Sequence, residues 1–203
     1  MRICNPLFIR IVYLRYIYTI MGLKNRIHKG YLYFLTITVV DWVDIFSRPV
    51  YKHIIIDSLK HCQKQKGLEI YAWCLMTNHL HLIVSVSPDN FYSLSDILRD
   101  FKKFTSKAIV EMIEKENESR KDWILNRFEF AGKYDPKIKC YKFWQEGNEA
   151  KEIHSNEFLE QKIEYVHQNP VVAEIVNEPE HYKFSSAVDY AGGKGLLEVI
   201  LED

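Results

Sequence analysis

The sequence predicts an α+β fold of the ferredoxin-like sandwich type, in which helices pack on an antiparallel sheet of four or five strands. Helix-period segments and short β-branched or aromatic segments alternate in the order strand, helix, strand, strand, helix, strand, helix. The chain has 203 residues, 47% of them hydrophobic, which is enough for one good core. No polar linker or repeat divides it, so we expect one domain over residues 21–203.

Residues 1–20 are predicted to be an N-terminal extension. They are apolar and aromatic, but Arg10 and Arg15 interrupt them and no small-residue cleavage site follows. The segment is too short and too charged for a membrane span, so no membrane partner is expected. It could be an interfacial arm, a strand added to the core, or an extension upstream of a start at Met21. We favour the last, because the recognisable motifs follow Met21.

The elements of the first half follow from local signals. The segment 31–40 is β-branched and aromatic throughout, which is typical of a buried strand. Pro49 opens a helix with apolar residues at helical spacing, and Gly67 ends it. Two strands follow, 68–75 and 79–86, joined by a tight connection.

The second half adds helices and one more strand. Ser93 or Ser95 is expected to cap a long helix, which a charged segment separates from a shorter one. A lysine-rich connection then leads to a strand at 141–145. Ser155 caps a further helix, which is expected to end at Pro170.

The overall composition gives no evidence for or against nucleic-acid binding. Lys and Arg number 27, as do Asp and Glu, so any surface that binds a polyanion must be local. The four cysteines are far apart and form no Cys-x-x-Cys pair. This pattern indicates reduced thiols in a cytoplasmic protein, not a disulfide framework or a zinc site.

Two histidines stand out in the strand 79–86. Side chains alternate along a strand, so His79 and His81 project from one face, about 7 Å apart, while Leu80 enters the other face. Two imidazoles at that spacing can bind one divalent ion. The alternative is two polar residues on a half-exposed strand, but the surrounding Leu, Ile and Val residues favour metal binding.

Tyr165 and Asn169 lie one turn apart on the helix before Pro170, at the border of its apolar face. A border tyrosine is most often a packing residue whose hydroxyl lies in water. Asparagine before proline also suits a helix end. The residues alone leave both interpretations open.

Together these segments resemble the single-tyrosine transposases, which carry a His-hydrophobic-His motif, and in particular the REP-associated tyrosine transposases. The strand motif is NHLH (78–81), and the helix motif is YVHQNPV (165–171). Three further motifs lie in the expected order: FKKFT (101–105), FWQ (143–145) and HYKFSS (181–186).

The resemblance implies a transposase that cuts and rejoins single-stranded, hairpin-forming DNA, and it suggests a homodimer. Tyr165 would attack a phosphodiester, become linked to the 5′ phosphate and release a 3′ hydroxyl. His79 and His81 would hold magnesium or manganese, with Asn169 as the third ligand. Because the chain carries no net charge, phosphate contacts are expected from local lysines. These are Lys102, Lys103, Lys107, Lys133, Lys137 and Lys139.

Other interpretations stay open at this stage. The lysines could belong to a solvated helix face and a loop. A non-catalytic nucleic-acid-binding module of ferredoxin-like shape would use sheet aromatics such as Tyr33, Tyr71 and Trp73 for stacking. A metal-independent phosphoesterase would use the two histidines as acid and base, although that chemistry normally draws them from separate strands. Only the transposase should form a metal-dependent covalent bond to DNA, so this observation distinguishes the three functions.

Overall fold

The computed structural model describes residues 27–136, 138 and 140–201. The predicted extension over residues 1–20 lies outside them. Within this part of the chain, no helix combines the length and the apolar character that a membrane span requires. Its cysteines are free thiols, of which Cys62 and Cys74 are buried and Cys140 is exposed.

Four antiparallel strands form the sheet at the centre of the fold. Their spatial order is β2-β3-β1-β4, so β3 and β1 occupy the middle. This order and the element sequence confirm the predicted ferredoxin-like α+β class. The strands are β1 (Tyr33–Thr38), β2 (Leu68–Leu75), β3 (His79–Val86) and β4 (Lys151–Glu152).

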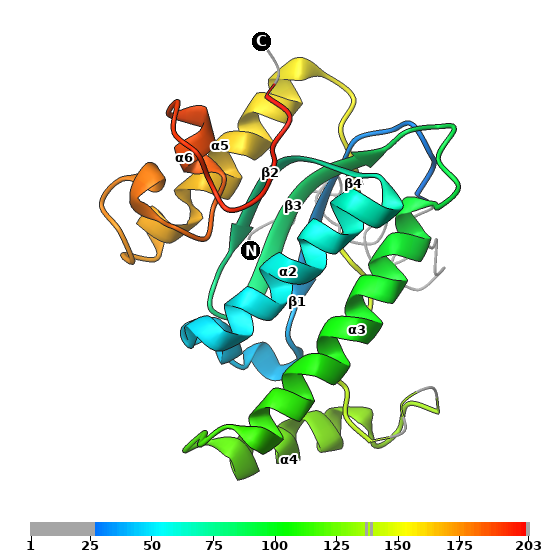
Figure 1. Cartoon of the computed structure of the whole chain (residues 1–203), viewed down its shortest axis with the longest axis vertical. Coiled ribbons are helices and arrows are strands. Elements are labelled where there is room, and N and C mark those ends of the chain that lie inside the picture. Colours follow the sequence, from blue (N-terminus) through cyan, green and yellow to red (C-terminus); the bar gives the residue numbers. More distant parts are fainter. Residues whose placement is uncertain (1–26, 137, 139, 202–203) are drawn as a thin grey trace, which may run out of the picture.

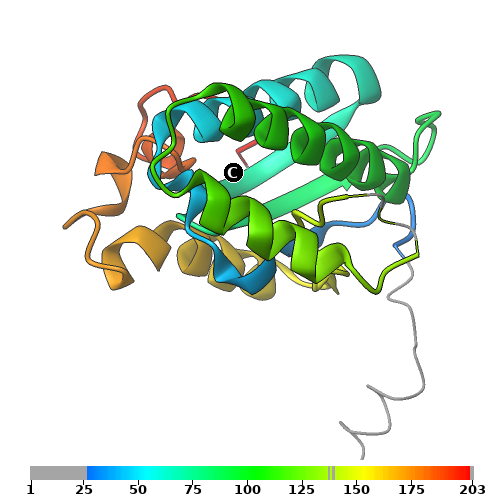
Figure 2. The ribbon, with the colours of Figure 1, turned by 90° about the horizontal axis from the view of Figure 1, so that it is seen from below.

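Helices cover both faces of this sheet. Two long helices, α2 and α3, lie side by side over one face, and α5 packs on the other (Figures 1 and 2). The α-helices are α2 (Pro49–Lys66), α3 (Leu94–Lys115), α4 (Lys121–Gly132), α5 (Asn156–Val172) and α6 (Ala187–Tyr190). Short 3-10 helices are η1 (Val40–Trp42), η2 (Ile45–Ser47) and η3 (Pro179–His181).

The main core lies between the sheet and the pair α2 and α3. Leu35 and Ile37 of β1 meet Leu80 and Leu82 of β3 in it, and all four are fully buried. Burying each such side chain stabilises the fold by about 1.5–3 kcal/mol. Because side chains alternate along a strand, the other residues of β1 and β3 point to the opposite face of the sheet, which α5 covers.

Local signals set the helix ends as predicted. Gly67 follows α2 with a φ of 66°, a left-handed conformation that glycine adopts without strain. Ser93 caps α3 through a capping box, in which its hydroxyl accepts from the Asp96 amide and the Asp96 carboxylate accepts from the Ser93 amide. Ser155 caps α5 by accepting from the Phe158 amide.

The strand predicted at 141–145 is wrong. This segment makes a single isolated bridge to the main sheet, between Val39 and Trp144, and β4 forms further along the chain. Phe143 and Trp144 are buried one after the other, which breaks the alternation of a strand. Gly147, with a φ of 81°, then turns the chain before β4 begins.

The predicted helix end at Pro170 is also wrong, because α5 continues to Val172. Proline removes one backbone donor and crowds the preceding turn. Here it lies only two residues before the helix ends, and Pro170 itself is buried. Burial of the proline ring offsets the loss of this backbone hydrogen bond.

The C-terminal motif HYKFSS (181–186) is hydrogen-bonded to the edge strand β2. Phe184 and Ser186 exchange backbone hydrogen bonds with β2, through the Leu75 amide and the Trp73 carbonyl. The Tyr182 hydroxyl donates to the Leu75 carbonyl. The segment therefore lies along the outer side of β2.

Candidate active site

The two histidines lie on β3, in the middle of the sheet. His79 pairs with Thr38 and His81 with Thr36 across β1. Their ring centroids are 4.6 Å apart, closer than the strand spacing of about 7 Å, so the rings converge. Leu80 between them is fully buried on the opposite face. Strand alternation thus brings both imidazoles to the side that α5 covers.

A polar neighbour holds each imidazole through its Nδ1 atom. His79 Nδ1 lies 2.6 Å from Asn78 Oδ1, and His81 Nδ1 lies 3.1 Å from Thr36 Oγ1. These contacts leave the Nε2 atoms for other partners. His81 Nε2 is buried and has no hydrogen-bond partner among the described residues. An unpartnered buried nitrogen calls for an explanation such as an ion.

Burial lowers the pKa of both imidazoles. The pKa of His81 falls to about 3, because burial, and then the neighbouring His79, oppose its charged form. Burial also lowers the pKa of His79. The side chain of Asn169 raises both pKa values, but by less than burial lowers them. Both rings are neutral at pH 7 and can offer nitrogen lone pairs to a cation.

Helix α5 brings Tyr165 to this pair of rings. The Tyr165 ring meets His81 at 5.3 Å between centroids and Phe34 at 5.9 Å, both edge to face. Buried residues such as Leu159 and Val166 attach the other side of the helix to the fold. Tyr165 nevertheless stays 49% exposed, so solvent and a ligand can reach it.

Asn169 completes the group. Its side-chain amide nitrogen donates to the Tyr165 carbonyl at 2.7 Å, so the side-chain oxygen is not used by that bond. The effect of Asn169 on the pKa values of His79 and His81 places it beside both rings. The four residues selected from the sequence therefore lie together.

The donor set fits a divalent cation. Within the described part of the chain, no group of three or more His, Cys, Asp and Glu side chains could hold a metal. His79, His81 and Asn169 instead offer two imidazole nitrogens and one amide oxygen as metal ligands. Of these atoms, His81 Nε2 is buried and has no hydrogen-bond partner among the described residues. Such a mixed set suits manganese or magnesium when water and phosphate oxygens fill the other positions.

Sequence reasoning missed two neighbours of the site. Lys162 places its ammonium 5.4 Å from the centre of the Tyr165 ring, and burial lowers its pKa. Its position three residues before Tyr165 on a helix could have indicated this contact. Thr36, the partner of His81, had no such signal, because only the register of β1 against β3 brings the two together.

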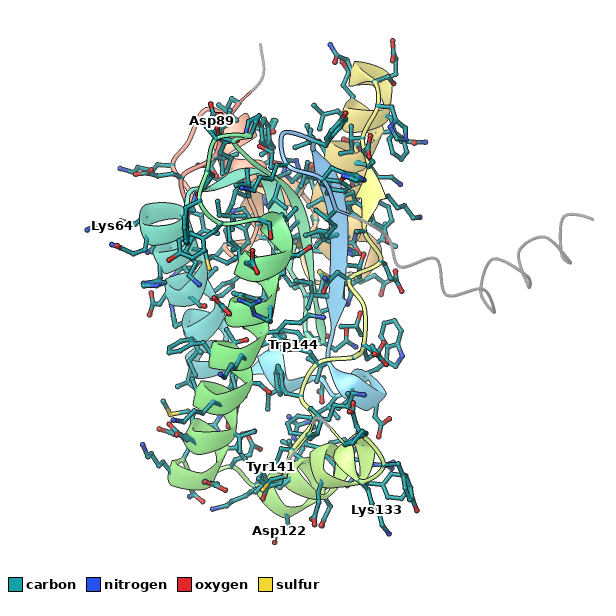
Figure 3. All side chains as sticks on the ribbon, turned by 90° about the vertical axis from the view of Figure 1, so that its right-hand side faces the viewer. Lys64, Asp89, Asp122, Lys133, Tyr141 and Trp144 are labelled. Carbon is teal, nitrogen blue, oxygen red and sulfur yellow. The ribbon has the colours of Figure 1, made fainter. Side chains whose placement is uncertain are left out.

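The predicted DNA-binding lysines differ in their surroundings. Lys102 donates to the carbonyls of Gln145 and Gly147, at 3.2 and 2.5 Å, and burial lowers its pKa to about 8. Lys103 is exposed, and Lys107 lies 3.7 Å from Glu111. The exposed Lys133 lies at the α4 end of the molecule (Figure 3). Two of the predicted set lie outside the described residues: Lys137 and Lys139.

A groove of about 620 Å³ runs beside α3, and Lys102, Lys103, Lys107 and Lys142 line it. Trp144 forms part of its wall, between α3 and the sheet (Figure 3). The Trp144 indole donates to the Thr105 hydroxyl at 3.0 Å, so the motifs FKKFT and FWQ hold each other in place.

Comparison with known proteins identifies the family of this chain and a solved structure of the same fold. The model of the family described as "Transposase IS200 like" matches residues 33–137, which are 105 of the 203 residues. No curated protein sequence matches the chain. The solved structure of a REP-associated tyrosine transposase bound to a REP hairpin is 18% identical, with a TM-score of 0.57, over 89% of this chain and 92% of that one. It has the same fold.

A putative transposase from Deinococcus radiodurans is 16% identical, with a TM-score of 0.40, and covers 70% of this chain and 94% of its own. The family match includes both histidines and the strands β1, β2 and β3. The chain belongs to the IS200-like transposase family.

Proposed function

We propose that this transposase cuts and rejoins single-stranded DNA through a covalent bond between Tyr165 and a 5′ phosphate. The observation that carries the proposal is the position of Tyr165, partly exposed and 5.3 Å from the ring of His81. The same imidazole has a buried nitrogen, Nε2, without a hydrogen-bond partner among the described residues, and binding of an ion would explain this. Packing of Tyr165 against the sheet would not explain it.

In the proposed step, the Tyr165 oxygen forms a bond to phosphorus while the bond to the 3′ oxygen breaks. The tyrosine proton passes to solvent, and the leaving 3′ oxygen takes a proton from solvent to become a hydroxyl. Forming a phenolate at pH 7 costs an unassisted tyrosine about 4 kcal/mol. The ammonium of Lys162, 5.4 Å from the ring centre, favours the negative charge that develops. The reverse attack by a 3′ hydroxyl rejoins DNA.

The histidines and Asn169 would hold a divalent metal ion, magnesium or manganese. When bound, the ion supplies positive charge beside the scissile phosphate. Thr36 and Asn78 fix the orientation of the imidazoles through their Nδ1 atoms, which keeps the Nε2 lone pairs available. The neutral state of both rings removes the competition from protons at pH 7.

For the DNA partner, we propose a single strand that forms a hairpin, the kind of DNA named for the similar REP-associated transposase. Gln145 lines the lysine-rich groove beside α3, and its backbone amide donates to the Thr38 carbonyl at 2.8 Å. Thr38 pairs with His79, so backbone contacts connect one wall residue of the groove to the strand that carries the histidines. Lys103 and Lys107 line this groove and are exposed, so they are the proposed phosphate contacts. The homodimer and the cytoplasmic location stay predictions.

The test is capture of DNA on a denaturing gel. The wild-type protein, incubated with single-stranded hairpin oligonucleotides and manganese, should form a covalent adduct. Tyr165→Phe deletes only the hydroxyl, so this variant should bind the same DNA and form no adduct. Tyr134→Phe is the control, because Tyr134 is 82% exposed and is not among the rings that contact His81.

An adduct with Tyr165→Phe would contradict the assignment and direct the search to Tyr141. Tyr182 is a poor substitute, because its hydroxyl is buried against the Leu75 carbonyl. DNA binding without any adduct from the wild-type protein would instead favour the non-catalytic binding module.

A further inference from the structure

Trp42 is a large aromatic residue on the surface beside the candidate metal ligands. Its side chain is 61% exposed, and its ring lies 6.4 Å from that of His79. With the steps of 4.6 Å from His79 to His81 and 5.3 Å from His81 to Tyr165, four rings form a row. Trp42 and Tyr165 are its two ends.

The backbone holds the indole outward in an uncommon conformation. Asp41 and Trp42 have φ values of 52° and 54°, in the left-handed region that bulky residues rarely adopt. Val40 and Val43 on either side are buried and anchor the turn. Arg127 of α4 pairs with the Asp41 carboxylate at 3.7 Å.

The same turn is tied to the histidines. The Asn78 side-chain nitrogen donates to the Trp42 carbonyl at 3.3 Å, while its oxygen contacts His79 Nδ1 at 2.6 Å. The position of the indole is therefore coupled to the imidazole that it faces. Folding gains little from an indole left in water, and a strained backbone that persists beside a site points to a function there.

We propose that Trp42 is a stacking platform for one unpaired base of single-stranded DNA, next to the phosphate that lies at His79 and His81. Aromatic side chains recognise unpaired bases through their faces, and each such stack contributes substantially to binding. An indole accepts any base, so Trp42 would position the strand and not read its sequence. This inference rests on the proposed function, because it places the phosphate at the histidines.

Tryptophan fluorescence provides a direct test. Trp42 and Trp123 are the exposed tryptophans, whereas Trp73 and Trp144 are buried. Single-stranded oligothymidylate should quench the emission of Trp123→Phe, which retains Trp42, and should leave the emission of Trp42→Phe nearly unchanged. A duplex, whose bases are paired, should quench neither. Equal quenching of both variants would overturn the proposal.

Binding of a labelled oligothymidylate gives the second measurement. Trp42→Ala should weaken binding by about 5- to 150-fold, the loss of one base stack, and Trp42→Tyr should restore most of it. Trp42→Gly should lose binding and yet melt no earlier than the wild-type protein, because glycine adopts a positive φ without strain. Unchanged DNA binding in Trp42→Ala, or a change in oligomeric state alone, would overturn the proposal in favour of a protein interface.

These measurements need no cleavage, so the two proposals can fail separately. If the wild-type protein forms no covalent adduct but Trp42 is quenched by single-stranded DNA, the cleavage proposal fails and the stacking platform stands. If Tyr165 captures DNA normally and Trp42→Ala binds and cleaves like the wild-type protein, the platform alone fails.

Discussion

Single contacts around the imidazoles orient the rings that we propose as metal ligands. Thr36 is the clearest example, because its hydroxyl lies 3.1 Å from His81 Nδ1 and it occupies the β1 position directly opposite that histidine. A partner on Nδ1 fixes both the orientation of the ring and the nitrogen that is left for the metal.

Thr36→Val should therefore weaken manganese binding by about 10- to 100-fold while keeping the shape of the side chain. Thr36→Ser should retain most of the affinity, because it keeps the hydroxyl. Thr38→Val is the matched control, since Thr38 lies on the same face of β1, opposite His79, whose Nδ1 contacts Asn78. Titration calorimetry measures all three variants, and equal affinities for Thr36→Val and Thr38→Val would show that the contact is incidental.

Among the elements, those with local signals were the ones that sequence reasoning placed well. Capping at Ser93 and the left-handed Gly67 depend on residues within one turn, and both were confirmed. The fourth strand was placed wrongly, because burial of both Phe143 and Trp144 depends on α3, α4 and η2 packing around them. A strand of two residues, such as β4, carries too little pattern to be recognised.

The candidate site divides in the same way. The spacing of His79 and His81 and the resemblance of the motif around Tyr165 to a known family selected these residues without any knowledge of the fold. The contact between Tyr165 and His81 depends on how α5 crosses the sheet, and the roles of Thr36 and Trp42 depend on strand register and on a turn. These are long-range features that periodicity does not encode.

The lysines of α3 allow a prediction about this element. Lys102→Met should destabilise the fold by about 1–3 kcal/mol, because the carbonyls of Gln145 and Gly147 lose their charged donor. Lys103→Met should change stability by less than about 0.5 kcal/mol, yet reduce the salt slope of DNA binding by about one. Urea denaturation measures the stability, and DNA binding at several salt concentrations measures the salt slope. If Lys102→Met reduced the salt slope and Lys103→Met lowered the stability, Lys102 would be the DNA contact instead.

At the scale of the whole molecule, His167 joins α5 to the C-terminal segment. Its Nε2 lies 2.8 Å from the Ser186 hydroxyl, and burial lowers the pKa of His167 to about 4. The partners of His167 are Ser186 and Tyr190, and neither is one of the candidate metal ligands. The folded state favours the neutral ring, so this stabilisation is present above the ordinary pKa of 6.5 and is lost as the pH falls towards 4.

His167 should therefore account for roughly 3 kcal/mol of the stability lost between pH 7 and pH 4. His167→Gln should unfold in urea with a shallower dependence on pH than the wild-type protein over this range. His61→Gln is the control, because His61 is exposed on α2. Parallel curves for the wild-type protein and His167→Gln would mean that this ring does not couple acid to unfolding.

The C-terminal segment beside β2 also limits how copies of the protein can associate. Phe184 and Ser186 occupy backbone groups of Leu75 and Trp73 that another chain would otherwise use to extend the sheet. At the other edge, β4 offers only two residues to a new strand. Edge-to-edge aggregation is therefore disfavoured at both ends of the sheet. Within the described part of the chain, helix and loop surfaces are therefore left for contacts between two copies, unless the segment that covers β2 first detaches.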